Sequence, residues 1–390
     1  MIVCHVAGTA QRGQDGVTRV LYEYLERHRV AGLSPLVLTA VADIKEGQRF
    51  PMVELPAIRL PVYRDYKLYT GGVGHLARAI EQTGMEPSLI HLHTPCPLGR
   101  AALRYARRVG IPVIATYHTH FPSYVRHHRA GVLRPLVERS IVDFYSQCDR
   151  VLVPSRILCQ ELVQRGVRSA VYLPHGTDTV QFHPRWGSRR WRSLIGIPPD
   201  KIVLLYVGRL VWEKNLRILI EMWDRLDKRR YALVIVGTGP IESRLRRSMP
   251  GAIFLGYRHG QALAEAYASS DVFVFPSDTE TFGNVTLEAL ASGLPCVVAD
   301  APGSAELVRH SVTGYRVDPY NAEQFVEAVE ALANMSPEHR MLWRWRARLD
   351  AEQYQWSRVC ADLFSHYRQL VEGQEAAVSV FAHTASLSSP

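Results

Sequence analysis

Two cations and a glycine form the first group of residues whose spacing suits chemistry. Arg209 and Lys214 lie five residues apart, and they follow an apolar run that ends at Gly208. Arginine supplies a planar fork of donors and lysine a compact charge, so the pair is suited to holding a diphosphate and stabilising it as a leaving group. Taken alone, such a pair would more often be a solvated charged loop.

Two carboxylates form the second group. Glu280 lies in an expected loop, and Glu288 lies on the second turn of an expected helix. Because they sit on different elements, we do not expect a close acid and base pair, and each is better suited to accepting hydrogen bonds from hydroxyl groups. The alternative is that Glu280 is a solvated loop acid and that Glu288 only complements the helix dipole.

The helix that carries Glu288 is itself a candidate anion site. Asn284 is the expected N-cap of a helix that reaches to about Ser292. Free amides from Gly283 to Thr286, together with the positive end of the helix, would then face an anion at the carboxyl edge of a strand. A diphosphate fits that position.

The N-terminal half offers a glycine turn and two histidines. Gly13 and Gly16 follow the first expected strand and precede an amphipathic helix, so this turn is expected to lie at the edge of a binding cleft, where Gly16 can approach a phosphate or sugar. His118 and His120 follow another expected strand. Taken alone, the turn and either histidine would most often be structural.

Residues 206–215 and 278–295 together resemble the retaining glycosyltransferases of family 4, which have the GT-B fold. The shared features are Gly-Arg-x4-Lys-Asn, the Phe-Gly-Asn loop and the Glu-x7-Glu spacing, in that order. Val236 to Pro240, Phe254 to Tyr257 and the helix that begins at Trp356 also look like family features, so the resemblance covers nearly the whole chain.

The resemblance implies a role for each candidate. Glu280 would contact sugar hydroxyls, Glu288 the ribose, and Arg209 and Lys214 the diphosphate. The Thr-x-His pattern implies that His118 lies near the donor sugar, with His120 as the reserve because strand alternation places it on the same face. The catalytic candidates are thus His118, Glu280, Arg209 and Lys214. The implied donor contacts are Gly16, Gly208, Arg209, Lys214, Gly237, Tyr257, Arg258, Glu280, Phe282, Gly283, Asn284, Val285 and Glu288. For Gly237, a plain turn from strand to helix is the alternative.

Short β-branched runs alternate with amphipathic stretches along the chain. This pattern is typical of the α/β class and predicts that parallel sheets position these residues. With the resemblance, we expect two Rossmann-like domains that face a cleft. The expected divisions are an acceptor-binding domain at 1–178, a linker at 179–193, a nucleotide-sugar domain at 194–353, a helix at 354–372 that returns to the first domain, and a mobile tail at 373–390.

Composition narrows the class of protein further. Hydrophobic residues make up 47% of the chain and charged residues 21%, which is typical of a globular protein. The net charge of +9 favours anionic partners. No aromatic and basic recognition module for nucleic acid appears. The six cysteines show no Cys-x-x-Cys pair, and we expect reduced core thiols.

The expected partners are a nucleotide sugar and an anionic membrane surface. From Phe121 to Arg139, basic and apolar residues interleave, a pattern that suits peripheral contact with an anionic membrane and equally suits a solvated basic helix edge. We expect a cytoplasmic protein, since no apolar run is long enough to span a membrane and the N-terminus lacks the pattern of a signal peptide. No Asp-x-Asp metal signature is present, so no metal cofactor is expected.

The predicted activity is transfer of a hexosyl group, of the mannose or glucose type, from a nucleoside diphosphate to an acceptor hydroxyl, with the retention that the resemblance implies. GDP-mannose and UDP-hexoses both fit as donors, and a membrane lipid or lipid-linked glycan is the expected acceptor. Two alternatives stay open at this point, a nucleotide-sugar epimerase on the same fold and a non-catalytic protein that binds sugar nucleotides.

Overall fold

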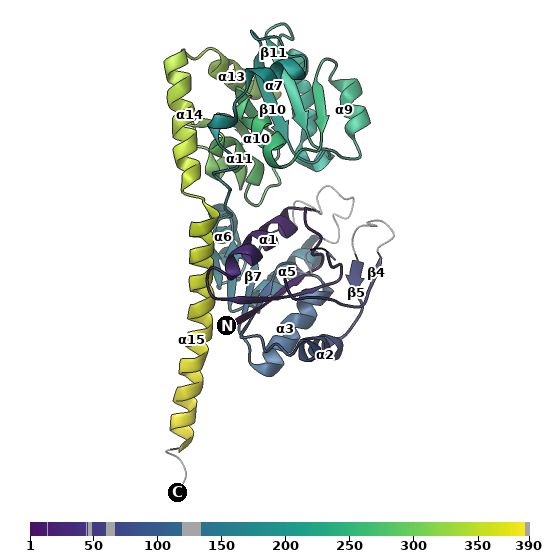
Figure 1. The fold of residues 1–390 in the computed structure, drawn as a ribbon, viewed down its shortest axis with the longest axis vertical. Helices are drawn as coiled ribbons and strands as arrows, with labels where there is room; N and C mark the ends of the chain where they lie inside the picture. The colour runs from purple at the N-terminus through teal and green to yellow at the C-terminus, as the bar shows by residue number, and fades with distance from the viewer. Residues whose placement is uncertain (14, 44, 46–48, 60–66, 119–133, 387–390) are drawn as a thin grey trace. The chain divides into compact units, whose positions relative to one another are not determined.

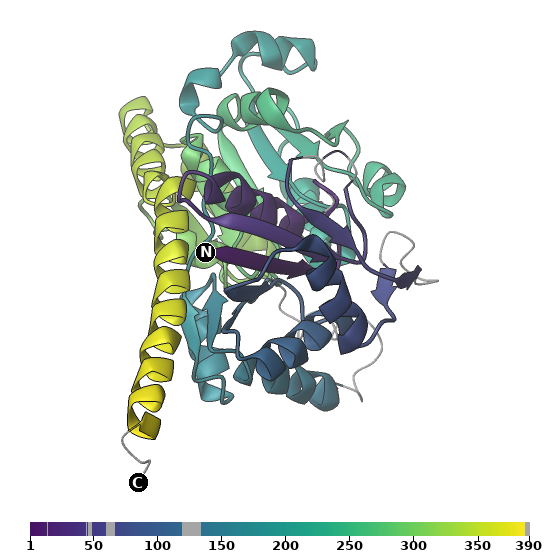
Figure 2. The same cartoon turned by 60° about the horizontal axis from the view of Figure 1, so that its bottom comes forward.

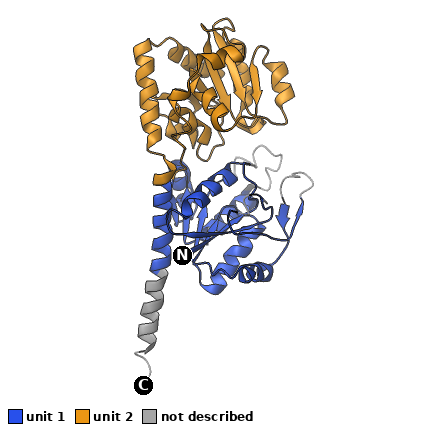
Figure 3. Cartoon of the chain, in the orientation of Figure 1, with its two compact units in different colours: residues 1–122, 130–173, 359–390 blue, residues 123–129, 174–358 orange. Residues whose placement is uncertain are grey.

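The computed structural model describes the 390-residue chain except for residues 14, 44, 46–48, 60–66, 119–133 and 387–390 (Figure 1). The chain divides into two compact units, which Figure 3 colours separately. The described residues before Pro174, together with those from Val359 onward, form unit 1, and Pro174–Arg358 form unit 2. His120 and most of the predicted membrane-facing segment lie outside the described residues.

Unit 1 is built on a parallel sheet with the strand order β3-β2-β1-β6-β7-β8-β9. Its strands are β1 (Ile2–Ala7), β2 (Ser34–Thr39), β3 (Met52–Glu54), β6 (Leu89–Leu92), β7 (Val113–Thr116), β8 (Arg150–Val153) and β9 (Ala170–Tyr172). A separate antiparallel pair consists of β4 (Ala57–Arg59) and β5 (Lys67–Tyr69). The helices are α1 (Gly16–His28), α2 (Val73–Thr83), α3 (Pro97–Val109), α5 (Arg134–Ser146), α6 (Arg156–Gln164) and the part of α15 (Trp356–Ser386) from Val359 onward.

Both faces of this sheet carry a hydrophobic core, because alternate residues of a strand point to opposite sides. Val37 of β2 packs with Leu21 and Leu25 of α1, whereas Leu36 belongs to the cluster that includes α3. Figures 1 and 2 show α1 on one face and α3 on the other. Burial on both faces is what parallel sheets in α/β proteins require.

Unit 2 repeats this plan with a parallel sheet of order β12-β11-β10-β13-β14-β15. Its strands are β10 (Ile202–Val207), β11 (Tyr231–Val236), β12 (Ile253–Gly256), β13 (Val272–Phe275), β14 (Cys296–Ala299) and β15 (Gly314–Val317). Its helices are η3 (Pro184–Trp186), α7 (Arg189–Leu194), η4 (Trp212–Lys214), α8 (Leu216–Arg225), α9 (Glu242–Ser248), α10 (Gly260–Ala268), α11 (Asn284–Ala291), α12 (Ser304–Leu307), α13 (Ala322–Ala333) and α14 (Pro337–Glu352). The α/β class with two parallel sheets is therefore confirmed.

Each sheet contains a point where the strand order reverses. In unit 1 it lies between β1 and β6, and in unit 2 between β10 and β13. Loops leave in opposite directions at such a point, which opens a crevice at the carboxyl ends of the strands where α/β proteins bind ligands. The predicted site loops that begin at Gly208 and Pro276 follow β10 and β13, so they flank the switch point of unit 2.

Two local differences from the sequence-based expectation concern regular structure. The predicted linker at 179–193 contains η3 and most of α7. The helix α15 continues to Ser386, into the range where a tail is predicted. The helix buries one apolar face, which includes Trp356, Leu363 and Tyr367.

Two further expectations concern the cysteines and membrane-spanning segments. All six cysteines are free thiols, in agreement with the prediction. Within the part of the chain that the structure describes, no helix combines the length and the apolar composition needed to cross a bilayer.

Candidate active site

The loops after β10 and β13 meet through an ion pair. The Lys214 Nζ lies 2.5 Å from Oε1 of Glu280, and the two side chains are 23% and 17% exposed. The Ser277 hydroxyl donates to the same carboxylate oxygen at 2.8 Å. The structure therefore brings together the residue predicted to hold the diphosphate and the residue predicted to contact the sugar. It also rules out the alternative that Glu280 is a solvated loop acid.

Asn215 joins three loops beneath this ion pair. Its backbone is left-handed, with φ of 53°, a conformation that asparagine tolerates better than most residues. Its side-chain amide donates to the carbonyls of Pro276 at 3.2 Å and Pro319 at 2.6 Å. The Thr279 hydroxyl also donates to the Glu213 carbonyl at 3.0 Å. The position of Lys214 is thus set by its neighbours on both sides.

Gly208 and Gly237 pack backbone against backbone at the ends of β10 and β11. A Cβ on Gly237 would lie 1.9 Å from the Gly208 carbonyl oxygen, and Gly237 has φ of 137°. Only glycine fits such an approach. The geometry supports the alternative reading of Gly237 as a structural turn, and its contact with a donor stays a prediction.

The N-terminus of α11 differs from the prediction. Gly283, with a left-handed φ of 92°, is the N-cap, and Asn284 is the first helical residue. A Cβ on Gly283 would lie 2.3 Å from the Ser304 hydroxyl oxygen, so crowding and φ together require glycine there. The Thr286 amide, expected to be available for an anion, donates to the Gly283 carbonyl at 2.9 Å. The stretch of amides predicted to face an anion, Gly283 to Thr286, therefore loses its last member.

Because Asn284 is not the N-cap, its side chain is available for another contact. It bonds to His175, a residue that the sequence analysis did not identify. Its Oδ1 accepts a hydrogen bond from Nδ1 of His175 at 3.2 Å, and the His175 ring lies 5.1 Å from that of Phe282. Both rings are buried. The available signal was a His-Gly pair directly after an expected strand, but the sequence does not show that it meets a loop more than one hundred residues away.

Glu288 is a buried acid, only 1% exposed. The hydroxyl of Tyr267 on α10 donates to its Oε2 at 3.0 Å. A buried carboxylate needs such donors because its desolvation is costly. Arg209, Tyr257 and Arg258 are exposed, in contrast, on the loops after β10 and β12. Val285, in the first turn of α11, is partly buried.

Unit 1 carries the remaining predicted residues in the segments that follow β1 and β7. Gly16 is the first residue of α1, and the Asp15 side chain caps this helix by accepting from the Thr18 amide at 2.8 Å. Among the described residues, no atom outside its chain neighbours and its own helix backbone lies within 4 Å of where a Gly16 Cβ would be. His118 follows β7 and is partly buried, and its Nε2 lies 3.1 Å from Nδ1 of His93.

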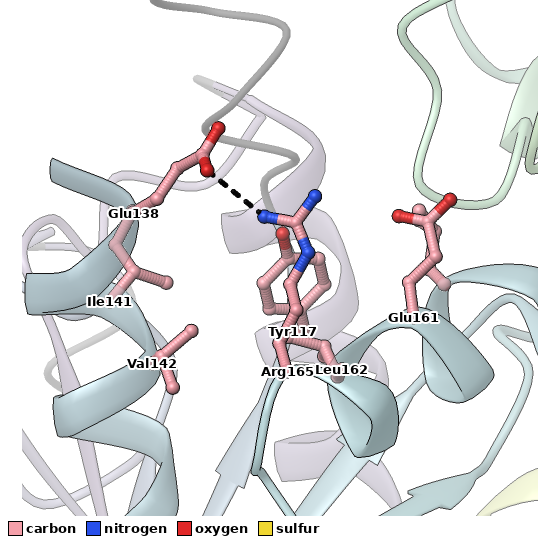
Figure 4. Close-up of a pocket in the computed structure, with 8 residues that line it drawn as sticks. Tyr117, Glu138, Ile141, Val142, Glu161, Leu162 and Arg165 are labelled. Carbon is pink, nitrogen blue, oxygen red and sulfur yellow. Dashed lines mark hydrogen bonds and ion pairs between the residues drawn. The ribbon is translucent and has the colours of Figure 1, made fainter. Parts of the chain in front are cut away.

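A pocket in unit 1 lies beside the residue that precedes His118 (Figure 4). Its lining is mainly apolar, and Arg165 spans it to contact Glu138 at 3.2 Å. Burial raises the pKa of Tyr117, which also lines it. None of the predicted site residues belongs to the lining, so this pocket is not the site that the sequence predicts.

Comparison with protein families matches both parts of the chain. Residues 14–181 match a model described as glycosyltransferase family 4, and residues 201–335 match one described as glycosyl transferases group 1. The first range includes Gly16 and His118, and the second includes the loops that hold Arg209, Lys214 and Glu280.

Three curated relatives illustrate the range of similar proteins. A GDP-mannose-dependent alpha-mannosyltransferase of Corynebacterium glutamicum is 31% identical over 95% of this chain and 89% of its own length. The sulfoquinovosyl transferase of Arabidopsis thaliana is 34% identical over 70% of this chain, which spans about half (54%) of that protein. A GDP-mannose-dependent alpha-(1-6)-phosphatidylinositol dimannoside mannosyltransferase of Mycobacterium tuberculosis is 29% identical over 80% of this chain and 81% of its own.

Among solved structures, a sucrose-phosphate synthase from Thermosynechococcus elongatus superposes with a TM-score of 0.78. The match covers 95% of this chain and 99% of that protein at 20% identity. A likeness at this identity shows the fold, which is the GT-B arrangement of two parallel-sheet domains.

Proposed function

Because this chain belongs to glycosyltransferase family 4, we propose that it moves a hexosyl group from a nucleoside diphosphate sugar to a lipid or lipid-linked hydroxyl, with retention of configuration. The observation that carries this proposal is the contact between Lys214 and Glu280 at the switch point of unit 2. Lys214 is the proposed cation for the phosphates, and the carboxylate beside it can accept hydrogen bonds from a sugar.

In the proposed reaction the bond between the anomeric carbon and the phosphate oxygen breaks, and the acceptor oxygen bonds to that carbon. Arg209, Lys214 and the first amides of α11 stabilise the charge that develops on the departing diphosphate. Glu280 and His118 hold the sugar, which makes the reaction intramolecular in character. The acceptor proton passes to a phosphate oxygen of the leaving group. Arg and Lys take the place of a metal ion, so activity is expected to persist in chelator.

Relatives support the choice of donor and acceptor. Two of the relatives described above are named as GDP-mannose-dependent, and one of these acts on phosphatidylinositol dimannoside. We therefore propose GDP-mannose as the first donor to test, UDP-glucose as the second, and a phospholipid-linked glycan as the acceptor. A lipid acceptor would bring the enzyme to a membrane surface as a peripheral protein.

The first experiment is a thermal-shift panel of nucleoside diphosphates and their sugars in the presence of chelator, because a ligand that binds the native state raises its apparent stability. A selective shift with GDP or UDP compounds supports the proposal and identifies the base. Transfer from the matching donor to lipid acceptors is then measured, with the anomeric configuration of the product read by NMR. A panel without any shift would contradict it, and an isomerised donor without transfer would indicate an epimerase.

A further inference from the structure

Four histidines of unit 1 form a continuous row of hydrogen bonds that begins at α1 and ends at His118. At the start of the row, Nδ1 of His28 lies 2.6 Å from the Tyr24 carbonyl, and Nε2 of His28 lies 3.1 Å from Nε2 of His5. The other nitrogen of His5, Nδ1, lies 2.9 Å from Nε2 of His93. At the end of the row, Nδ1 of His93 lies 3.1 Å from Nε2 of His118. The row crosses from α1 through β1 to His93, the residue directly after β6.

The rings of His28, His5 and His93 are neutral at ordinary pH. His5 and His28 are fully buried and His93 is 1% exposed. Burial lowers the pKa of His28 to about 4 and that of His93 to about 3, and burial together with both neighbours holds the pKa of His5 well below its usual value. A neutral imidazole has one donor and one acceptor nitrogen. Each ring in the row can therefore donate in only one direction.

The Tyr24 carbonyl sets that direction, because it can only accept a hydrogen bond. His28 must donate to it from Nδ1, which leaves Nε2 of His28 as an acceptor. His5 must then donate from Nε2 and accept at Nδ1. The same reasoning makes His93 donate from Nε2 and accept at Nδ1.

The last contact transfers this constraint to the candidate active site. Since Nδ1 of His93 is an acceptor, His118 must donate to it from Nε2. When His118 is neutral, its proton is therefore on Nε2 and its Nδ1 is an acceptor. One backbone carbonyl on α1 thus determines, through three buried rings, which nitrogen of His118 carries the proton.

A metal site is the competing explanation, since nitrogen atoms of His5, His91 and His93 lie within 4.8 Å of one another. All six ring nitrogens of these residues already have protein partners. The nitrogens of His91 contact the Tyr367 hydroxyl at 2.6 Å and the Thr116 hydroxyl at 2.7 Å. A metal would have to break several of these buried bonds, so the hydrogen-bonded row explains the cluster better.

We propose that Tyr24, His28, His5 and His93 act as positioning residues that hold His118 as the Nε2-protonated tautomer, so that its Nδ1 accepts a hydrogen bond from a hydroxyl of the donor sugar. The role of His118 toward the sugar rests on the proposed function, whereas the tautomer does not. The row is not a path for protons to solvent, because it ends at a carbonyl that cannot take one up.

The decisive measurement is the protonation of each ring nitrogen in the full-length wild-type chain, read from long-range proton–nitrogen NMR correlations on protein labelled with nitrogen-15 histidine. Single substitutions assign the signals. We expect Nδ1 of His28 and Nε2 of His5, His93 and His118 to carry the protons. A proton on Nδ1 of His93 or His118 in the wild type overturns the proposal. This result does not depend on any activity, so it is separate from a failure of the proposed function.

A substitution far from His118 tests the direction of control. His28→Leu removes the acceptor for the Nε2 proton of His5. A buried N–H without a partner is costlier than a nitrogen acceptor without one, so in each remaining ring the proton is expected to move to the other nitrogen. His118 should then carry its proton on Nδ1, and transfer should slow about tenfold, the equivalent of one hydrogen bond. An unchanged His118 tautomer in folded His28→Leu overturns the proposal.

Tyr367→Phe is the matched control. It also removes a hydrogen bond from a buried histidine of the same sheet, but that histidine, His91, is not part of the row. We expect the His118 tautomer and the transfer rate to stay within twofold of the wild type. An equal effect in both variants would show that loosening of the core, and not the row, is responsible, and would also overturn the proposal.

Discussion

Lys214 and Glu280 pair across 66 residues of sequence, with Nζ 2.5 Å from Oε1. In the absence of a donor the two charges neutralise each other and connect the loops after β10 and β13. A diphosphate would give Lys214 a second anion, and a sugar would give Glu280 hydroxyl donors. The pair therefore holds the binding loops near the arrangement that the proposed reaction needs.

Loss of the Arg209 side chain should lower activity without affecting folding. Its side chain is exposed, so Arg209→Ala should fold normally, whereas loss of a charge that stabilises the leaving diphosphate should lower kcat/KM by about a hundredfold. Steady-state kinetics with the identified donor measure this. Arg225→Ala, an exposed arginine on α8, is the control and should keep full activity. Full activity in Arg209→Ala would remove Arg209 from the site.

The coupling between Lys214 and Glu280 can be measured by a double-mutant cycle. We expect Lys214→Met and Glu280→Gln to show a coupling free energy of about 1 kcal/mol in urea unfolding, near the upper end for such pairs because both side chains are largely shielded. The more exposed pair of Arg246 and Glu242 on α9 serves as the reference and should give less. Additive effects of Lys214→Met and Glu280→Gln would show that their contact contributes nothing to the free energy of unfolding.

Asn215 is expected to be a stability residue of the site. Asn215→Ala loses two hydrogen bonds and puts in the left-handed region a residue that tolerates it less well than asparagine, so it should lower the free energy of unfolding by about 2–3 kcal/mol. Asn215→Gly keeps the backbone conformation and loses only the bonds, so it should cost less. Equal losses would mean that the backbone conformation contributes nothing.

The buried histidines predict a loss of stability in acid. The pKa of His28 is lowered from 6.5 to about 4, and that of His93 from 6.5 to about 3. The unfolded chain therefore binds more protons below pH 6.5. Stability should be full above that pH and fall towards pH 4 by up to about 1.4 kcal/mol per pH unit for each such residue.

Urea unfolding at a series of pH values measures this slope. His28→Leu should show a shallower dependence than the wild type, since one of the residues that must take up a proton is gone. A variant of an exposed histidine, His259→Gln, should leave the slope unchanged. A wild-type midpoint that does not move between about pH 6.5 and pH 4 would contradict the neutral state of these rings.

Much of the fold could be predicted because buried parallel strands are continuous apolar runs. Runs such as Ile202–Val207 and Val272–Phe275 coincide with β10 and β13. The strand β15 was missed, because its sequence Gly-Tyr-Arg-Val carries an exposed arginine and lies at a sheet edge. The three-residue strands β3, β4 and β5 are too short for any periodicity to appear.

The site was predictable as a set of loops but not as a set of contacts. Parallel topology brings the loops after β10 and β13 to one edge, so the sequence could place Lys214 and Glu280 near a common ligand. It could not show that they bond to each other. The N-cap was assigned to Asn284 from its residue type, yet the crowding of Gly283 against Ser304, which decides the cap, is a tertiary effect. His175 was missed for the same reason.

The place of β10 between β11 and β13 also sets an order of events during synthesis on the ribosome. When Arg209 and Lys214 emerge, neither of the strands that flank β10 in the sheet has been made, and β13 follows only after β11 and β12. The bond from Asn215 to Pro319 must wait longer still. A nascent chain therefore carries the cations of its anion site well before it carries the carboxylate that neutralises one of them.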